Sequence, residues 1–169
     1  MDAEKTEKTR RNLQAAYVGE AKAQVRNRLF SEVADKEGLV QVARLFRAVA
    51  EAESVHARNA LALLGELKST EENLRFAFEH ENLAKNQLYP RFIREAEEEG
   101  AAEASRRFSQ ARDVEDRHSQ LYRSALSYLV NEEAVAYFVC QVCGYVAESN
   151  IPERCPICGA VSKFFKEVE

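Results

Sequence analysis

The sequence has little glycine and proline, no long apolar run and no large excess of charge of one sign. Only six of its 169 residues are glycine and three are proline, and long stretches without either residue favour helix. No apolar run approaches the ~20 residues of a membrane span, and the charged opening residues 1–5 lack the apolar core of a signal peptide. The net charge of −4, with both signs interspersed, provides no basic surface for nucleic acid or anionic lipid. We therefore expect a cytoplasmic protein that binds neither nucleic acid nor membrane.

Cysteine is absent before residue 140, and the four cysteines that follow form two close pairs, Cys140-x-x-Cys143 and Cys155-x-x-Cys158. Such pairs indicate metal ligands rather than a disulfide framework. Each pair is followed by glycine, which permits the turn that aims backbone N–H groups at a thiolate sulfur. A tetrahedral four-sulfur site accepts zinc or iron. The short segment around it needs a metal, because folds below about 40 residues are rarely stable without a metal or a disulfide.

The first 130 residues have the apolar periodicity of helices. Four helical stretches are predicted, at about 5–36, 39–64, 69–99 and 101–129. Gly65 supplies the C′ position of the second stretch, and Ser69-x-x-Glu72 is a capping box at the start of the third. Pro90 lies inside the third stretch and is expected to kink it around Tyr89. The four stretches therefore form two helical hairpins of similar length.

Each hairpin carries one glutamate and one Glu-x-x-His motif at matched spacing. A Glu and a His three residues apart lie on one helical face, because a turn takes about 3.6 residues. A single such motif is typical of an ordinary solvated face. Here both motifs and both upstream glutamates fall in the apolar stripes, and unpaired buried carboxylates are strongly penalised, so the set indicates a bound cation. Its members are Glu20, Glu53, His56, Glu81, Glu115 and His118.

Four carboxylates and two imidazoles from four helices are the ligand set of a di-iron carboxylate centre. Oxygen-rich coordination with two histidines suits iron or manganese better than structural zinc. Glu53 and Glu115 are expected to bridge the two ions. Each histidine then binds one ion, and Glu20 and Glu81 are terminal ligands. Tyr89 faces this site, either as plain core packing or as a hydrogen-bond donor to a ligand carboxylate.

The placement of the four cysteines beside a redox site favours iron over zinc in the four-sulfur site, because iron there could pass single electrons to the helical site. The predicted cofactors are therefore two iron ions in a carboxylate-bridged centre and one iron bound by four cysteines. Zinc in the four-cysteine site is the alternative.

The connection between the two hairpins, at about residues 65–68, is too short to cross a helical bundle. Roughly 20 Å of helix separates Glu53 from Gly65, whereas four residues reach at most about 14 Å. The bundle is therefore either up-down-up-down, or the hairpins separate and each pairs with the other hairpin of a second chain. We expect the second arrangement, a domain-swapped homodimer.

On these residues, the chain resembles the rubrerythrin family along nearly its whole length. The Cys-x-x-Cys-Gly-Tyr and Cys-Pro-x-Cys-Gly segments at the C-terminus resemble the rubredoxin module of that family. The helical motifs that carry the resemblance are Gly19-Glu20, Ala50-Glu51-Ala52-Glu53-x-x-His56-Ala57, Leu88-Tyr89-Pro90 with Glu97-x-Glu99-Gly100, and Glu115-x-x-His118. The resemblance implies a mainly α protein, with a ferritin-like di-iron four-helix domain at 1–134 and a small rubredoxin-like Fe(Cys)4 β domain at 135–169.

The resemblance also implies a function. Rubrerythrins reduce hydrogen peroxide to water, with electrons from NAD(P)H that arrive through a reductase or rubredoxin. They are dimers, and some are swapped. A ferroxidase or iron-handling protein of the bacterioferritin type is the alternative, although a dimer has no storage cavity and an electron-donating module would serve no purpose there. A structural bundle with a zinc ribbon is the third hypothesis.

Two positions depart from the family pattern. The family usually has a further glutamate three residues after the position of Glu81, where this chain has Ala84. It also commonly has a tyrosine seven residues after the first ligand glutamate, where this chain has Asn27. One iron of the family exchanges that extra glutamate for a histidine, here His56, when its redox state changes. We therefore expect six protein ligands and one histidine on each ion in both redox states, closer to the symmetric bacterioferritin arrangement.

Overall fold

The computed structural model describes residues 3–127 and 135–168, and the chain divides into two compact units, Met1–Lys68 and Ser69–Glu169. All four predicted helical stretches are helical over their described residues, the end of the fourth at 128–129 lying outside them, and a small sheet follows. The mainly α fold with a small β module is therefore confirmed. The predicted domain boundary between residues 134 and 135 lies at the edge of a segment outside the described residues.

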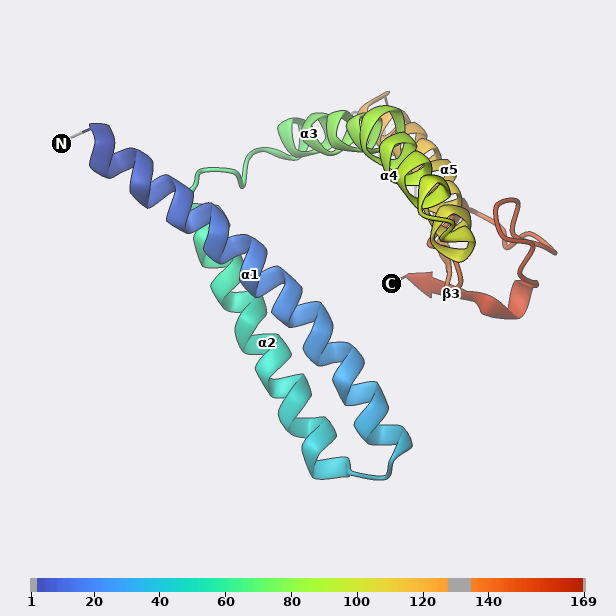
Figure 1. Ribbon diagram of the computed structural model, residues 1–169, viewed down its shortest axis with the longest axis horizontal. Helices are drawn as coiled ribbons and strands as arrows, with labels where there is room; N and C mark the ends of the chain where they lie inside the picture. The colour runs from blue at the N-terminus through green and yellow to red at the C-terminus, as the bar shows by residue number, and fades with distance from the viewer. Residues whose placement is uncertain (1–2, 128–134, 169) are drawn as a thin grey trace. The chain divides into compact units, whose positions relative to one another are not determined.

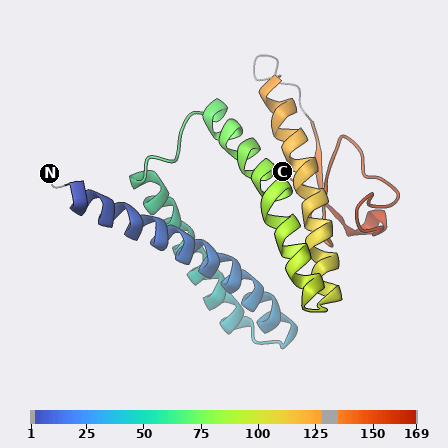
Figure 2. The same cartoon turned by 45° about the horizontal axis from the view of Figure 1, so that its top comes forward.

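The first unit is a hairpin of two long helices, α1 (Ala3–Lys36) and α2 (Val40–Leu63), which lie side by side and are joined by a short turn (Figures 1 and 2). Gly65 follows α2 with a φ of +70°, and its N–H donates to the Ala62 carbonyl at 3.0 Å. This left-handed conformation after the last helical turn is the one that glycine adopts without strain. The predicted C′ role of Gly65 is confirmed.

Small residues hold the two helices of the first unit together. The buried residues of the hairpin are mostly alanines: Ala34, Ala43, Ala50, Ala57 and Ala60. Larger apolar residues of α2 are exposed, with Leu45 at 62% and Leu63 at 74%. The reason is that one neighbouring helix covers only part of a wide apolar stripe. The hairpin therefore has apolar surface left to cover.

The helices of the second unit are α3 (Thr70–Leu83), α4 (Tyr89–Glu98) and α5 (Ala102–Ser127). The first two run end to end alongside α5 (Figure 2). Ser69 begins α3 with the predicted capping box, in which its hydroxyl accepts from the Glu72 N–H while the Glu72 carboxylate accepts from the Ser69 N–H. These bonds satisfy backbone donors that a helix start leaves without partners.

The third predicted stretch is not one uniform helix. A π-helical segment, η1 (Ala84–Leu88), joins α3 to α4, and the Tyr89 N–H donates to the Ala84 carbonyl across its wide turn. Pro90 follows directly, and a proline in a helix lacks an N–H and crowds the carbonyl four residues before it. The wider turn accommodates both effects, so the expected kink at Tyr89 takes the form of a π segment.

The β module is an antiparallel three-stranded sheet in the order β2-β1-β3. Its strands are β1 (Tyr137–Cys140), β2 (Val146–Glu148) and β3 (Phe165–Val168), and a short 3-10 helix, Ser162–Phe164, precedes β3. Cys140, Ala147 and Cys155 are the buried residues of the module, whereas Phe164 is exposed. Two cysteines therefore lie at the centre of the module.

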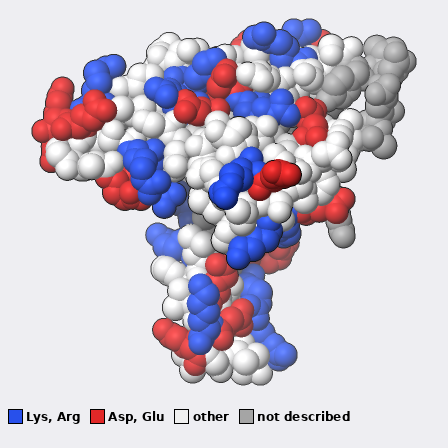
Figure 3. Space-filling view, turned by 90° about the vertical axis from the view of Figure 1, so that its right-hand side faces the viewer, with Lys and Arg blue, Asp and Glu red and all other residues white. Residues whose placement is uncertain are grey.

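Charges of both signs lie side by side over the face shown in Figure 3, as the sequence predicts. That face has no broad field of a single sign. Among residues 3–127 and 135–168, no helix combines the length and apolar character that crossing a membrane requires.

Candidate metal centres

The first unit brings together one glutamate from α1 and the first Glu-x-x-His motif from α2. One ligand atom each from Glu20, Glu53 and His56 lies within 4.8 Å of the others. The His56 Nδ1 is 3.0 Å from a Glu53 carboxylate oxygen, as expected for residues one helical turn apart. The His56 side chain is 60% exposed, so the expectation that the whole set is buried is wrong at this position in the described chain.

The second unit assembles the matching group from α3 and α5. One ligand atom each from Glu81, Glu115 and His118 lies within 4.8 Å of the others. The His118 Nδ1 is 2.9 Å from one Glu115 oxygen and 3.9 Å from a Glu81 oxygen. All three side chains are largely buried. Two carboxylates and an imidazole nitrogen thus converge on one point inside the helix pair.

The protonation states of the second group favour a cation. Burial, the negative charge of Glu115 and a hydrogen bond to Glu115 raise the pKa of Glu81 to about 7. The hydrogen bond from His118 lowers the pKa of Glu115 against the opposing effect of its burial. Two carboxylates this close cannot both be ionised cheaply without a positive charge between them. A divalent metal supplies that charge, so the donor set fits a metal ion.

His118 connects the second group to the β module. Its Nδ1 faces the carboxylates, and its Nε2–H donates to the Gly144 carbonyl at 3.2 Å. The bond with Glu115 raises the pKa of His118, and it outweighs the opposing effect of burial. Donation from Nε2 to a carbonyl keeps the proton on Nε2, so Nδ1 is the nitrogen that can bind a metal once it gives up the proton it shares with Glu115. This contact was not predicted from the sequence, because 26 residues separate its two partners.

Two tyrosines border the same carboxylates. The Tyr89 hydroxyl donates to Glu115 at 3.4 Å, which matches the second of its two predicted roles. Burial, followed by the charge of Glu115, raises the pKa of Tyr89. Tyr122 is not among the predicted site residues. Burial and the charges of Glu81 and Glu115 raise its pKa, so it lies close to both carboxylates. The signal for Tyr122 was its position four residues after His118, one turn along α5.

The four cysteines come together in the β module as predicted. One Sγ from each lies within 4.8 Å of the others. The Cys140–Cys158 and Cys143–Cys155 sulfur distances are 3.7 and 3.5 Å. A tetrahedron with metal–sulfur bonds of about 2.3 Å has edges of about 3.8 Å, so the cluster has the size of a metal site.

Backbone donors prepare these sulfurs for a metal. Burial of the Cys140 thiol opposes its ionisation, but N–H groups of Val142 and Cys143 donate to the sulfur and lower its pKa overall. Burial raises the pKa of Cys143, whose sulfur accepts an N–H bond from Tyr145. A thiolate in such a place needs a positive partner, and a bound metal provides it.

The structure thus brings the six predicted helical ligands together as two groups of three, one in each unit. Each group holds a terminal glutamate and a Glu-x-x-His motif, as the repeat predicts. The joining of the two groups into one centre of six ligands stays a prediction.

Comparison with known proteins identifies both parts of the chain. The rubrerythrin family model matches residues 11–126, and the model of the rubredoxin-like domain of rubrerythrin matches residues 138–166. A rubrerythrin of Porphyromonas gingivalis is 35% identical, over 98% of this chain and 92% of that protein. Nigerythrin of Nitratidesulfovibrio vulgaris is 32% identical, over 89% of this chain and 81% of that protein.

Solved structures agree with these matches. Nigerythrin in its mixed-valent state superimposes with a TM-score of 0.59 at 31% sequence identity, over 95% of this chain and 86% of that one. The predicted fold class, a ferritin-like helical bundle with a rubredoxin-like domain, is confirmed. So are the predicted cofactor sites, a di-iron carboxylate site and a four-cysteine site. The chain belongs to the rubrerythrin family of oxidoreductases.

Proposed function

We propose that this protein reduces hydrogen peroxide to water at a di-iron site and that the electrons pass through the iron of its four-cysteine site. The position of His118 is the observation that carries the proposal. One ring nitrogen of His118 faces the carboxylates of Glu81 and Glu115, and the other donates to the carbonyl of Gly144, the residue after Cys143. A single side chain therefore connects the carboxylates of Glu81 and Glu115 with the segment that holds Cys143.

In the proposed site, the two groups of three act as one set of six ligands. Glu53 and Glu115 would bridge two ions, Glu20 and Glu81 would be terminal ligands, and His56 and His118 would each bind one ion through Nδ1. The orientation of both histidines supports this assignment, because each Nδ1 already lies beside the glutamate of its own motif. The absence of a carboxylate at Ala84 leaves one histidine per ion in both redox states.

When bound, a pair of ferrous ions supplies the two electrons that, with two protons, convert one hydrogen peroxide into two waters. The chain's own residues set the conditions for this reaction. Gly144 holds the His118 ring in the tautomer that leaves Nδ1 available. Tyr89 donates a hydrogen bond to Glu115 and so steadies the orientation of a bridging carboxylate. Burial around Glu81 and Glu115 keeps bulk water from screening their attraction to the ions.

We further propose that the protein is a domain-swapped homodimer. The segment between α2 and α3 is short, and the first hairpin exposes large apolar residues such as Leu45 and Leu63. Apolar surface of this kind marks a place where another element packs. The second hairpin of a partner chain is an element of matching length that also completes the ligand set.

Complementation between two inactive variants tests the swap. A Glu53→Gln chain has a defective first group and an intact second group, and a Glu115→Gln chain has the reverse. In a swapped heterodimer, one centre combines the two intact groups and recovers activity. In an unswapped heterodimer, both centres hold one defective group and no activity returns. Co-expression with two different tags isolates the heterodimer for this assay.

Rubredoxin or an NAD(P)H-dependent reductase is the proposed electron donor in the cytoplasm. In this proposal, residues 1–134 form the di-iron domain and residues 135–169 form the domain that receives the electrons. The ferroxidase alternative is not favoured, because a four-cysteine module follows the helices and the relatives are rubrerythrins and nigerythrin.

The activity is tested on the iron-loaded protein after full reduction without oxygen. Hydrogen peroxide should oxidise it faster than O2 does, with one peroxide consumed for every two electrons. The visible absorption of a ferric four-cysteine site should then appear. A Cys158→Ser variant serves as the control, since it should lack that absorption. Faster oxidation by O2 with accumulation of ferric mineral would indicate a ferroxidase, and a colourless protein with zinc at the cysteines would indicate a structural bundle.

A further inference from the structure

One face of α5 contacts the β module through residues spaced by three and four positions: Val114, Arg117 and His118. This spacing puts all three on one side of the helix. A Cβ atom added to Gly144 would lie 3.7 Å from a Val114 methyl, so the module backbone approaches the helix closely at that point. The His118 ring meets the Gly144 carbonyl beside it.

Arg117 makes the most contacts of this face with the module. Its Nε donates to the Val146 carbonyl at 3.0 Å, and its Nη2 donates to the Glu148 carboxylate at 2.7 Å. The guanidinium carbon is 6.0 Å from the centre of the Tyr145 ring. The Arg117 and Glu148 side chains are only 23% and 28% exposed, so solvent screens this ion pair less than a surface pair.

We propose that Arg117 is a positioning residue, which holds the four-cysteine module against α5 so that Gly144 stays in contact with His118. The inference rests on the proposed route of electrons from the cysteine-bound iron to the di-iron site. Arg117 itself belongs to none of the three metal-binding groups.

Arg117 binds the module close to Gly144, which explains how it keeps Gly144 in contact with His118. Val146 is only two residues after Gly144, so a bond to its carbonyl fixes the Gly144 carbonyl relative to α5. Strand β2 is an edge strand of the sheet, and an edge strand has backbone groups without partners in the sheet. The planar guanidinium reaches a carbonyl and a carboxylate at once, which a lysine ammonium on a flexible stem does less well.

The first experiment follows electron transfer in the fully reduced, iron-loaded chain after mixing with hydrogen peroxide. In Arg117→Gln, oxidation of the cysteine-bound iron should slow, because loss of a charge-assisted hydrogen bond lowers the equilibrium constant for docking about ten-fold and the module spends more time away from α5. Oxidation of the di-iron site by peroxide, followed in the same traces, should keep its wild-type rate. Arg117→Lys should restore part of the lost rate.

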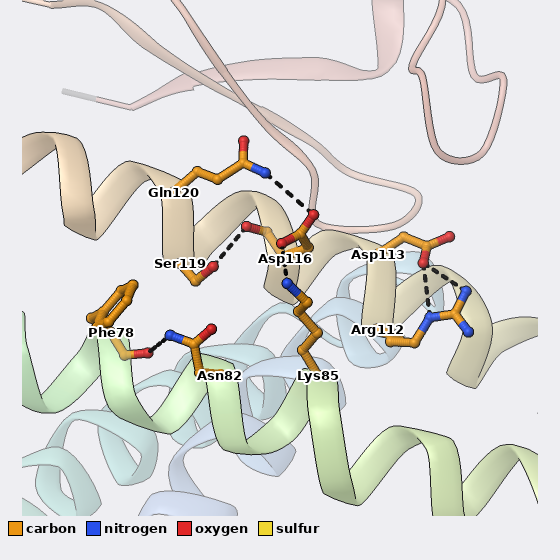
Figure 4. Close-up of polar contacts among 8 residues, drawn as sticks. All are labelled: Phe78, Asn82, Lys85, Arg112, Asp113, Asp116, Ser119 and Gln120. Atoms are coloured by element: carbon orange, nitrogen blue, oxygen red, sulfur yellow. Dashed lines mark hydrogen bonds and ion pairs between the residues drawn. The ribbon is translucent and has the colours of Figure 1, made fainter.

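The matched control is Arg112→Gln. Arg112 lies on the same helix five residues earlier, and its guanidinium binds the neighbouring Asp113 (Figure 4). This variant removes one arginine from α5 without removing a bond to the module, so both oxidation rates should match wild type. An unchanged rate at the cysteine-bound iron in Arg117→Gln would overturn the proposal. If peroxide oxidises neither site in the wild-type protein, the proposed function fails instead.

The second experiment needs no turnover. Zinc occupies the four-cysteine site of the full chain, and hydrogen exchange of backbone amides is measured. In Arg117→Gln, the segment 144–148 and the facing part of α5 should exchange about ten-fold faster, while α1 and α2 keep their wild-type rates. Unchanged exchange at 144–148 would show that the module stays docked without Arg117, which also overturns the proposal.

Discussion

Metal binding by Glu81, Glu115 and His118 should displace a proton from Glu81, and the fraction of a proton released should depend on pH. Burial, the charge of Glu115 and a hydrogen bond to Glu115 raise the pKa of Glu81 to about 7 in the metal-free chain. A carboxylate must be ionised to bind a metal, so protons and metal compete below that pH. For one proton with a pKa of about 7, the metal affinity should be about ten-fold weaker at pH 6 than at pH 8.

Titration calorimetry measures this linkage directly. Manganese is added to the chain with zinc already in the four-cysteine site, in buffers that differ in their heat of ionisation. The difference in heat counts the protons released on binding. Glu81→Gln removes the titrating group, so at pH 7 it should release about half a proton fewer than wild type. The charge of Glu81 also helps to raise the pKa of His118, so the variant should release fewer protons from His118 too, which adds to the difference.

Glu79→Gln is the control for this measurement. Glu79 is an exposed residue of α3, two positions before Glu81, so its replacement should leave the proton count unchanged. Equal proton release by wild type and Glu81→Gln would refute the reasoning about the site. So would a manganese affinity that is the same at pH 6 and pH 8.

Three further predictions concern stability and the two metal sites. A raised pKa stabilises the metal-free fold below pH 4.5, and that stabilisation is lost as the pH rises through 7. Glu81→Gln should therefore stabilise the metal-free chain at pH 8 by about 1 kcal/mol of unfolding free energy after solvent screening, which raises the Tm by about 2–4 °C. At pH 5 the Tm should change little, and calorimetry at both pH values checks this. Cys155→Ser should abolish the visible absorption of the iron-loaded four-cysteine site and unfold the β module, since Cys155 is one of the few buried residues of that module. The helical signal in far-ultraviolet circular dichroism should remain. Tyr89→Phe should lower stability by no more than about 1 kcal/mol, measured by denaturant unfolding, because its bond to Glu115 is long at 3.4 Å.

Interactions along a single helix were predictable from the sequence. Spacing by three residues places Glu115 beside His118 and Glu53 beside His56, and both pairs are in contact. The capping box at Ser69 is likewise a local pattern, and so is the glycine after α2. Each depends only on the geometry of one turn, which neighbouring residues specify by themselves.

Contacts between elements distant in the chain were decided by the tertiary structure. Lys85 of η1 reaches Asp116 of α5 at 2.5 Å (Figure 4), and Arg117 reaches β2. No spacing rule indicates either pair, because their partners are about thirty residues apart and meet only through the packing of whole elements. The apolar periodicity of the sequence also does not distinguish the exposed His56 from the largely buried His118. The sequence by itself determined which residues can bind metal. The packing of the β module on α5 decided that His118 contacts the segment that holds Cys143. Burial and docking of this kind depend on what covers a helix face and not on the sequence pattern of that face.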